Sequence, residues 1–289
     1  ELAVSCGFAP GNISFTAGSL SKDDYRILHR YRDLNINCDS LHAIRTWGEL
    51  RPGSSIGIRV NPGLGVSREG NERLQYAGRA ITKFGIYREQ FNDALALARQ
   101  SDLRIARIHF HTGCGYLTEQ LSQLDEVITR CLWFAEQCPD LQRVNIGGGL
   151  GVPHDSNDRR LDVDAWARLL YRHFKDKSFD LDVEPGEYVM KDAGLLLLSK
   201  TYLEQKADTL FLGVDAGFNL APEPAFYDLR FQPLALRLPD GVARELQKVT
   251  VVGNINEALD VFYRDALLPN MGGEDYLALI NAGAYSTSM

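Results

Sequence analysis

The feature that most constrains the fold is the alternation of short β-rich runs with helix-periodic segments over the first two thirds of the chain. Strands are predicted at residues 13–16, 35–38, 55–60, 105–110, 144–146 and 179–184. Helices are predicted between them, at residues 22–32, 40–50, 88–101, 118–137 and 162–174. This alternation indicates parallel βα units, and glycines at the strand ends favour a (β/α)8 barrel over an open Rossmann sheet.

The pattern changes near residue 194, where strands are predicted at residues 195–204, 209–214, 248–252 and 276–282, with proline-rich turns and little helix between them. We therefore expect a barrel domain over residues 1–193 and a mostly β domain over residues 194–289. The βα units before residue 13 are too few for a closed barrel, and the chain ends just after a predicted strand. We expect the barrel to be incomplete at its N-terminus and the β domain to be partial.

Composition narrows the classes of function. The chain has 45% hydrophobic and 24% charged residues and a net charge of -7, which is typical of a soluble globular protein. It has no basic run and no apolar run long enough to cross a bilayer, so neither a nucleic acid nor a membrane is expected as partner. The five cysteines are irregularly spaced, which predicts free thiols in a reducing cytoplasm and no metal site.

Three motifs follow predicted barrel strands, where barrel enzymes bind their ligands. They read HFHTGC at residues 109–114, GGG at 147–149 and EPGEY at 184–188. His111 taken alone is better explained as a satisfied histidine at a strand end, and the adjacent Thr112, Gly113 and Cys114 shift the balance toward a site. A glycine triplet lets backbone N–H groups approach phosphate oxygens, although most glycine runs are simple turns. Glu184 at a strand end needs a cationic partner if it is buried.

Three further motifs lie in the predicted β domain. They read VDAG at residues 214–217, NEALD at 256–260 and GAY at 283–285. Taken in order, the six motifs resemble those of the fold-type III pyridoxal-phosphate decarboxylases of basic amino acids, closest to the diaminopimelate decarboxylases. The resemblance covers nearly the whole chain. It implies an alanine-racemase-like barrel, pyridoxal 5'-phosphate as cofactor, an amino-acid substrate and a homodimer with shared active sites.

The resemblance also assigns roles to residues. His111 stacks on the pyridine ring, and Glu184 faces the pyridine nitrogen and keeps it protonated. Catalytic roles fall to His111, Glu184 and Glu257. The residues expected to bind the cofactor are His111, Cys114, Gly147, Gly148, Gly149, Glu184, Gly186 and Tyr285. The residues expected to bind the substrate are Asp215, Glu223, Glu257 and Asp260.

This chain departs from the family pattern at four positions. Cys114 replaces a serine and is a weaker hydrogen-bond donor to a phosphate. Glu187 and Glu223 replace arginines, which argues against a substrate with a free distal carboxylate, unless both side chains have simply moved out to solvent. Asn256 replaces a cysteine that handles a proton, and asparagine cannot act as a general acid. Either another group protonates the product, or the outcome differs from simple decarboxylation.

The lysine that binds the cofactor in relatives is also not where the family has it. No lysine precedes Lys22, so we expect the cofactor-binding lysine on a segment before Glu1.

Two alternatives to a decarboxylase stay open. A catalytically silent homologue that binds a protein partner is favoured by Asn256 and Glu187 and disfavoured by the retained cofactor motifs. A changed reaction on the same cofactor, such as racemisation, is the other.

Overall fold

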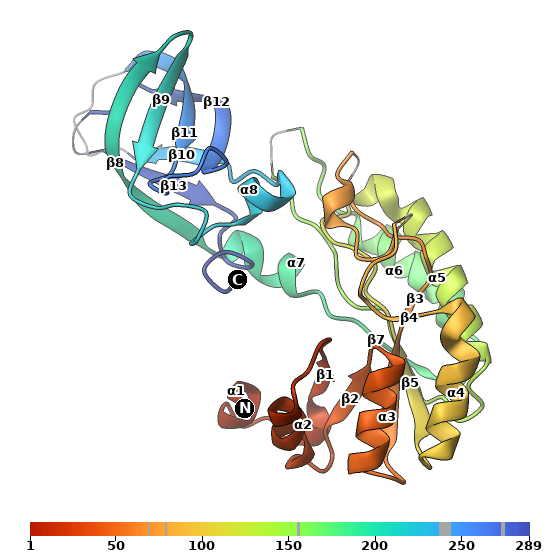
Figure 1. The fold of residues 1–289 in the computed structure, drawn as a ribbon. Helices are drawn as coiled ribbons and strands as arrows, with labels where there is room; N and C mark the ends of the chain where they lie inside the picture. The colour runs from red at the N-terminus through yellow and green to blue at the C-terminus, as the bar shows by residue number, and fades with distance from the viewer. Residues whose placement is uncertain (69, 79, 155–156, 237–243, 273–274) are drawn as a thin grey trace. The chain divides into compact units, whose positions relative to one another are not determined.

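The computed structural model describes the chain except for residues 69, 79, 155–156, 237–243 and 273–274. The chain forms two compact units, drawn in Figure 1. The first comprises Glu1–Gly149 and Asp162–Glu184, and the second comprises Leu150–Leu161 and Pro185–Met289. The short stretch Leu150–Leu161 therefore belongs to the second unit, although the chain returns to the first unit after it.

The first unit is built on a parallel sheet with the order β1-β2-β3-β5-β6-β7, and β4 pairs with β3. Its strands are β1 (Ser14–Thr16), β2 (Asn35–Cys38), β3 (Ser55–Asn61), β4 (Ile86–Tyr87), β5 (Arg104–His109), β6 (Arg143–Asn145) and β7 (Asp180–Asp182). All paired strands of this sheet are parallel, and apart from β4 each strand pairs with the next along the chain. Such a sheet is the open half of a barrel, as the βα spacing predicts.

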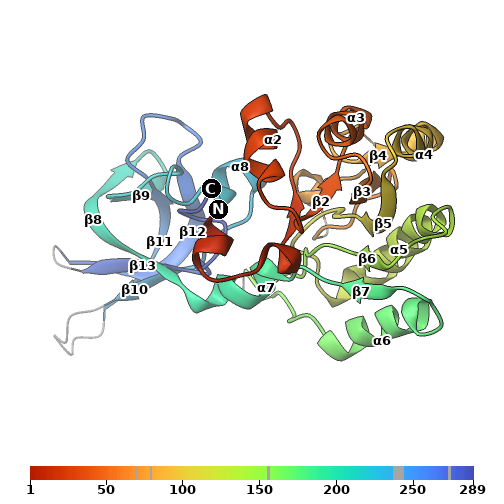
Figure 2. The same cartoon turned by 90° about the horizontal axis from the view of Figure 1, so that it is seen from below.

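Helices connect these strands and line the outer side of the curved sheet, as Figure 2 shows. They are α2 (Lys22–His29), α3 (Leu41–Leu50), α4 (Phe91–Gln100), α5 (Leu121–Glu136) and α6 (Val163–Phe174), whereas the short α1 (Leu2–Ser5) precedes β1. Short 3-10 turns are η1 (Pro10–Asn12), η2 (Glu72–Leu74), η3 (Arg88–Gln90) and η4 (Thr118–Gln120). Ser21 and Ser40 cap α2 and α3 by accepting hydrogen bonds from backbone N–H groups through their side-chain oxygens.

The core of the first unit lies between the sheet and these helices. Ile56 and Ile58 of β3 are fully buried, and Trp47, Phe91 and Phe134 from three different helices are at most 1% exposed. Burial of apolar side chains at about 25 cal/mol per Å² makes this layer the main stabilising contribution of the unit. The strands are thereby held rigidly, so the side chains at their carboxyl ends have fixed positions.

The second unit contains a six-stranded sheet with the order β10-β13-β8-β9-β11-β12. Its strands are β8 (Leu195–Lys206), β9 (Thr209–Val214), β10 (Pro233–Leu236), β11 (Leu246–Val252), β12 (Val261–Pro269) and β13 (Tyr276–Ile280). Neighbouring strands are antiparallel except β9 and β11, which are parallel. The short helices α7 (Gly186–Met190) and α8 (Glu223–Tyr227) and the 3-10 turn η5 (Lys191–Ala193) complete the unit.

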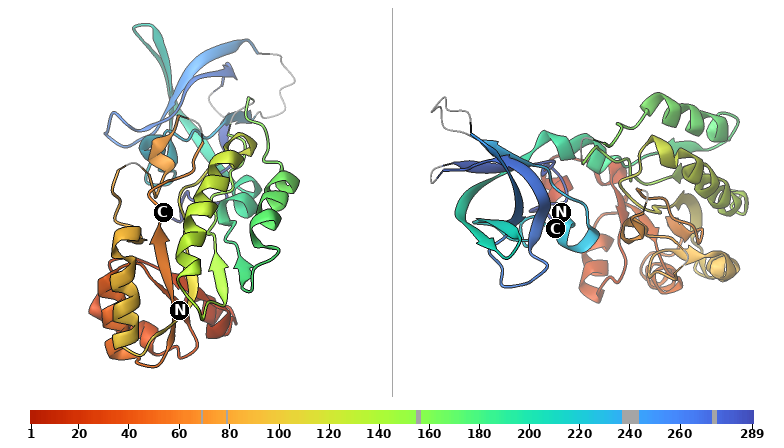
Figure 3. Two further views of the ribbon diagram at one scale, coloured as in Figure 1. Left: turned by 90° about the vertical axis from the view of Figure 1, so that its right-hand side faces the viewer. Right: turned by 90° about the horizontal axis from the view of Figure 1, so that it is seen from above.

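The long strand β8 joins the two halves of this sheet. Its first residues pair with β13 and its later residues pair with β9, so the sheet curves around a core that contains Leu198, Phe231 and Leu277 (Figure 3). The mostly β character of this unit is the predicted one. Among the residues that the structure places, no helix is both long and apolar enough to span a membrane.

Candidate active site

Polar side chains gather at the carboxyl ends of the parallel strands in the first unit. Glu184, two residues beyond β7, accepts a hydrogen bond from Asn145 Nδ2 at 2.8 Å, and its other oxygen lies 3.4 Å from His109 Nε2. Its backbone N–H donates to Gly147 O at 2.8 Å. Three adjacent strand ends thus fix one carboxylate, because β5 ends at His109 and β6 ends at Asn145.

The environment of Glu184 favours its ionised form. Burial by itself raises the pKa of this carboxyl, but the hydrogen bond and charge of His109 and the hydrogen bond from Asn145 outweigh burial and hold the pKa below its usual value. The side chain is 42% exposed, so a ligand can reach it. An ionised, accessible carboxylate at the mouth of a barrel is suited to pair with a protonated ring nitrogen.

Two charged residues at this edge were not predicted. Arg59 on β3 is 8% exposed, lies 4.6 Å over the ring of Phe84 and interacts electrostatically with Asp39 and Glu184. Asp39, directly after β2, is 6% exposed; burial raises its pKa and the charge of Arg59 opposes that shift. The sequence held a signal for Arg59, because it is the one charged residue in the predicted strand 55–60 and an arginine is rarely buried without a partner.

The glycine triplet forms a tight loop after β6. Gly147 and Gly149 have φ of +69° and +94°, which residues with a Cβ rarely adopt. A Cβ on Gly149 would lie 2.2 Å from Gly113 O, and one on Gly147 would lie 2.6 Å from Phe110 O. Between them, the N–H of Gly148 points to His111 Nδ1 at 3.3 Å. The loop therefore needs glycine, and it places bare backbone against the HFHTGC segment.

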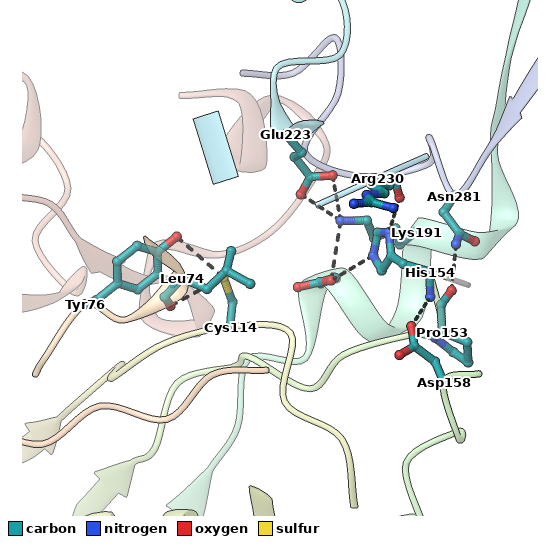
Figure 4. Close-up of polar contacts among 11 residues, drawn as sticks. Leu74, Tyr76, Cys114, Pro153, His154, Asp158, Lys191, Glu223, Arg230 and Asn281 are labelled. Carbon is teal, nitrogen blue, oxygen red and sulfur yellow. Dashed lines mark hydrogen bonds and ion pairs between the residues drawn. The ribbon is translucent and has the colours of Figure 1, made fainter. Parts of the chain in front are cut away.

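His111 and Cys114 lie beside this loop, and both side chains have Tyr76 as a neighbour. The His111 ring has its centroid 5.1 Å from that of Tyr76, at an angle of 48°. The thiol of Cys114 lies 3.8 Å from both Leu74 O and the hydroxyl of Tyr76 (Figure 4). The first unit thus brings together His111, Gly147, Gly148, Gly149 and Glu184, with Cys114 at the start of the neighbouring loop.

This group of residues fits a pyridine ring that carries a phosphate. Gly147 and Gly149 have no room for a Cβ, which keeps this loop free of side chains, and Glu184 is an ionised partner for a ring nitrogen. Gly147, Gly148 and Gly149 would bind the phosphate, His111 the ring face and Glu184 the nitrogen. When bound, such a cofactor supplies an electron sink for bond cleavage at an amino acid's α-carbon.

The remaining predicted residues lie in the second unit, which is described by itself. Gly186 begins α7, and a Cβ placed on it would lie 3.6 Å from the hydroxyl of Tyr285. Tyr285 is 45% exposed and has φ of +54°, a conformation uncommon for a residue with a side chain. These two predicted phosphate contacts are therefore neighbours.

The NEALD segment forms an exposed loop after β11. Asn256 and Glu257 are exposed, whereas Asp260 is 3% exposed. The Asp260 carboxylate accepts hydrogen bonds from the N–H groups of Phe218 and Ile255, at 2.8 and 2.7 Å. Asp260 thus fixes the loop that presents Glu257, and its contact with a substrate stays a prediction. The exposed Asp215 accepts a hydrogen bond from the N–H of Ser199 at 2.8 Å.

The suggestion that Glu187 and Glu223 lie in solvent is wrong. They are 4% and 5% exposed, and Lys191, which is 0% exposed, lies between them. The Lys191 ammonium donates to both oxygens of Glu223 at 2.6 and 2.7 Å and lies 3.4 Å from Glu187 Oε1 (Figure 4). A buried carboxylate is stable only when it is paired, and the lysine provides that pairing here.

His154 completes this buried cluster. Its Nδ1 lies 2.7 Å from Arg230 O and, because a carbonyl only accepts, Nδ1 is the donor. Its Nε2 lies 4.0 Å from Glu187 Oε1. Burial raises the pKa of Glu187, but His154 and Lys191 outweigh burial and lower it; burial raises the pKa of Glu223 to about 7, despite Lys191. We call Glu187, Lys191, Glu223 and His154 the Lys191 cluster.

This chain has the features of a barrel enzyme that binds a phosphorylated pyridine cofactor: a half-barrel of parallel strands, a carboxylate at their ends and a glycine loop. Comparison with known families agrees with this. The family described as "Pyridoxal-dependent decarboxylase, pyridoxal binding domain" matches residues 1–191, and "Pyridoxal-dependent decarboxylase, C-terminal sheet domain" matches residues 162–283. The chain belongs to the pyridoxal-dependent decarboxylases of fold type III and is a pyridoxal-phosphate-dependent amino-acid decarboxylase.

Individual relatives point to one branch of this family. Diaminopimelate decarboxylase of Methanothermobacter thermautotrophicus is 30% identical over 99% of this chain and 68% of its own length. The Escherichia coli K12 diaminopimelate decarboxylase is 29% identical over 100% of this chain and 72% of its own length. A crystal structure of a point mutant of diaminopimelate decarboxylase from Helicobacter pylori, complexed with L-lysine, has a TM-score of 0.86 and 25% identity, covering 99% of this chain and 72% of that one.

Proposed function

We propose that this decarboxylase acts on an amino acid whose distal end carries no free carboxylate. One observation carries the proposal: Glu187 and Glu223 are buried and share a single ammonium, that of Lys191. The three groups together carry formally one negative charge when both carboxylates are ionised. A net negative cluster gives no electrostatic attraction to a carboxylate at the distal end of a substrate. It does not repel a distal amine or a masked, uncharged carboxylate.

The roles of the other residues follow from their positions. His111 covers the ring of the cofactor, Glu184 pairs with its nitrogen, and the backbone of Gly147, Gly148 and Gly149 binds its phosphate. Gly186, Tyr285 and Cys114 complete the phosphate contacts, with Cys114 the weakest donor. Glu257 and Asp215 contact the substrate. Asp260 positions the Glu257 loop, and Glu223 acts by excluding a distal anion.

We further propose that two copies of the chain share their active sites. The loop around Glu257 is exposed and presents an apolar residue, Leu259, which is 43% exposed. An exposed apolar residue next to a candidate substrate contact is suited to a subunit interface. For each subunit we keep residues 1–193 as the proposed cofactor-binding domain and 194–289 as the proposed β domain, although the compact units exchange at Glu184 and include Leu150–Leu161 in the second unit. We place the enzyme in the cytoplasm, with no nucleic acid or membrane as partner.

The test is CO2 release from a panel of amino acids by the full-length, cofactor-loaded protein. The panel contains lysine, ornithine, diaminopimelate, and glutamate or aspartate conjugates whose distal carboxylate is an amide or thioester. We expect release from an amine or conjugate and at least about 10-fold slower release from diaminopimelate, since one lost charge-assisted contact corresponds to roughly that factor. Diaminopimelate as the fastest substrate would overturn the proposal.

A catalytically silent homologue is the second candidate, favoured by Asn256, which cannot supply a proton. Titration with pyridoxal phosphate followed by borohydride reduction and intact-mass measurement separates the two. An adduct on a lysine supports the enzyme. A protein that takes up no cofactor supports the silent homologue.

A further inference from the structure

The Lys191 cluster joins three separate parts of the second unit. Glu187 belongs to α7, Lys191 begins η5, Glu223 begins α8, and His154 comes from the stretch Leu150–Leu161. All four side chains are at most 6% exposed. The Lys191 ammonium cannot touch a substrate from this position. Its effect must therefore pass through the backbone that it fixes.

That backbone is bonded directly to the turn that carries Tyr285. Lys191 O accepts a hydrogen bond from Gly283 N at 2.9 Å, and Gly194 O accepts one from Ala282 N at 2.9 Å. The contact is close, because a Cβ on Gly283 would lie 2.0 Å from Met190 O. The turn at Gly283 thus packs against η5 with no space between them.

A second connection runs through the other end of the same turn. Asn281 Nδ2 donates to Pro153 O at 2.7 Å, next to His154 of the cluster. Ser286 Oγ donates to Ala282 O at 2.7 Å and closes the turn on itself. Tyr285 therefore stands on a turn that is held on both sides by residues adjoining the Lys191 cluster.

We propose that Lys191 is a positioning residue for the cofactor phosphate: pinned by Glu187 and Glu223, it holds the Gly283–Tyr285 turn in the conformation that binds phosphate. The inference rests on the proposed contact between Tyr285 and the phosphate. It gives a role to a lysine that has no access to solvent and lies between two carboxylates. It also explains how Tyr285 keeps a φ of +54° in an exposed turn.

The test is the variant Lys191→Ala in the full-length protein, with binding of pyridoxal phosphate and of pyridoxal, which lacks the phosphate, measured separately. Loss of a well-placed contact to a charged phosphate lowers affinity by roughly 10- to 100-fold. We expect that loss for pyridoxal phosphate and a change under about 2-fold for pyridoxal.

Lys248→Ala is the matched control, because Lys248 forms an exposed ion pair with Asp265 at 3.3 Å in the same unit. It should change neither affinity. Equal losses for both ligands in Lys191→Ala, or no loss for either, would overturn the proposal. If Lys191→Ala does not fold, the binding of pyridoxal phosphate and of pyridoxal is compared instead in a protein that carries both Lys191→Met and Glu223→Gln, which keep the side-chain shapes and remove the charges. Wild-type protein that binds neither ligand refutes the proposed function instead, so the two failures are distinguishable.

Discussion

Glu223 makes the stability of the second unit depend on pH in an unusual direction. Its pKa rises from 4.5 to about 7 on folding, because burial outweighs the attraction of Lys191. The folded state therefore binds a proton more tightly than the unfolded state between these values. The proton on Glu223 therefore contributes its full stabilisation at pH values below the pKa of the unfolded state. That stabilisation is lost as the pH rises through the pKa of the folded state.

The magnitude follows from the two pKa values. Each unit corresponds to about 1.4 kcal/mol, so the difference between wild type and Glu223→Gln should fall by about 2.5 kcal/mol from about pH 5 to about pH 8. Glutamine keeps the shape and cannot ionise. Lys191, His154 and Glu187 surround position 223 in both proteins. The lowered pKa of Glu187 places its titration below this window.

The assay is urea unfolding at several pH values, followed by far-ultraviolet circular dichroism for the β unit. All three tryptophans, Trp47, Trp133 and Trp166, belong to the first unit, so tryptophan fluorescence is an internal control that should not respond. Because a chain with two compact units is not expected to unfold in a single two-state transition, the curves are fitted with one transition for each unit. A difference that stays constant with pH, or grows as pH rises, would refute a raised pKa at Glu223.

Three further predictions concern the first unit and the assembly. Gly149→Ala should destabilise the first unit by more than about 1 kcal/mol and weaken pyridoxal-phosphate binding. Gly63→Ala is the control, because Gly63 has φ of +66° and a Cβ there would have nothing within 4 Å, so only backbone strain is expected. Urea unfolding followed by tryptophan fluorescence compares the two variants. Asn145→Ala should move the acidic limb of the decarboxylation pH profile upward, because Asn145 helps to lower the pKa of Glu184; an unchanged limb contradicts this. Glu184→Ala and Glu257→Ala proteins, each inactive alone, should regain about one quarter of wild-type activity when co-expressed, since random pairing leaves one intact shared site in half of the dimers. No recovery would argue against shared sites.

Regular elements were predictable because their periodicity is local. The six predicted barrel strands and the helices between them were confirmed, with ends shifted by a few residues. Strand β12 was missed, because Arg264 and Asp265 interrupt its apolar pattern. Strand β10 was missed because it begins with Pro233, which usually marks a turn.

The Lys191 cluster was not predictable from the sequence. Glu187 and Lys191 are four residues apart and resemble an exposed helical ion pair, which is common on surfaces. Their burial depends on Glu223, which is brought beside them only by tertiary packing. The motifs located Glu184 and the glycine loop because both follow strands directly. They could not show which side chains β3 adds to the same edge, so Arg59 was missed.

The stretch Leu150–Leu161 has a consequence for how this protein can be divided. The second unit is assembled from two separate lengths of chain, and the first unit resumes between them. A truncated protein that starts at Pro185 therefore lacks His154 and the carbonyl of Pro153, and leaves Glu187 and Asn281 without these neighbours. The β unit is not a portable module that can be cut out, grafted or exchanged between enzymes at one junction. Any functional chimaera has to carry both stretches from the same parent.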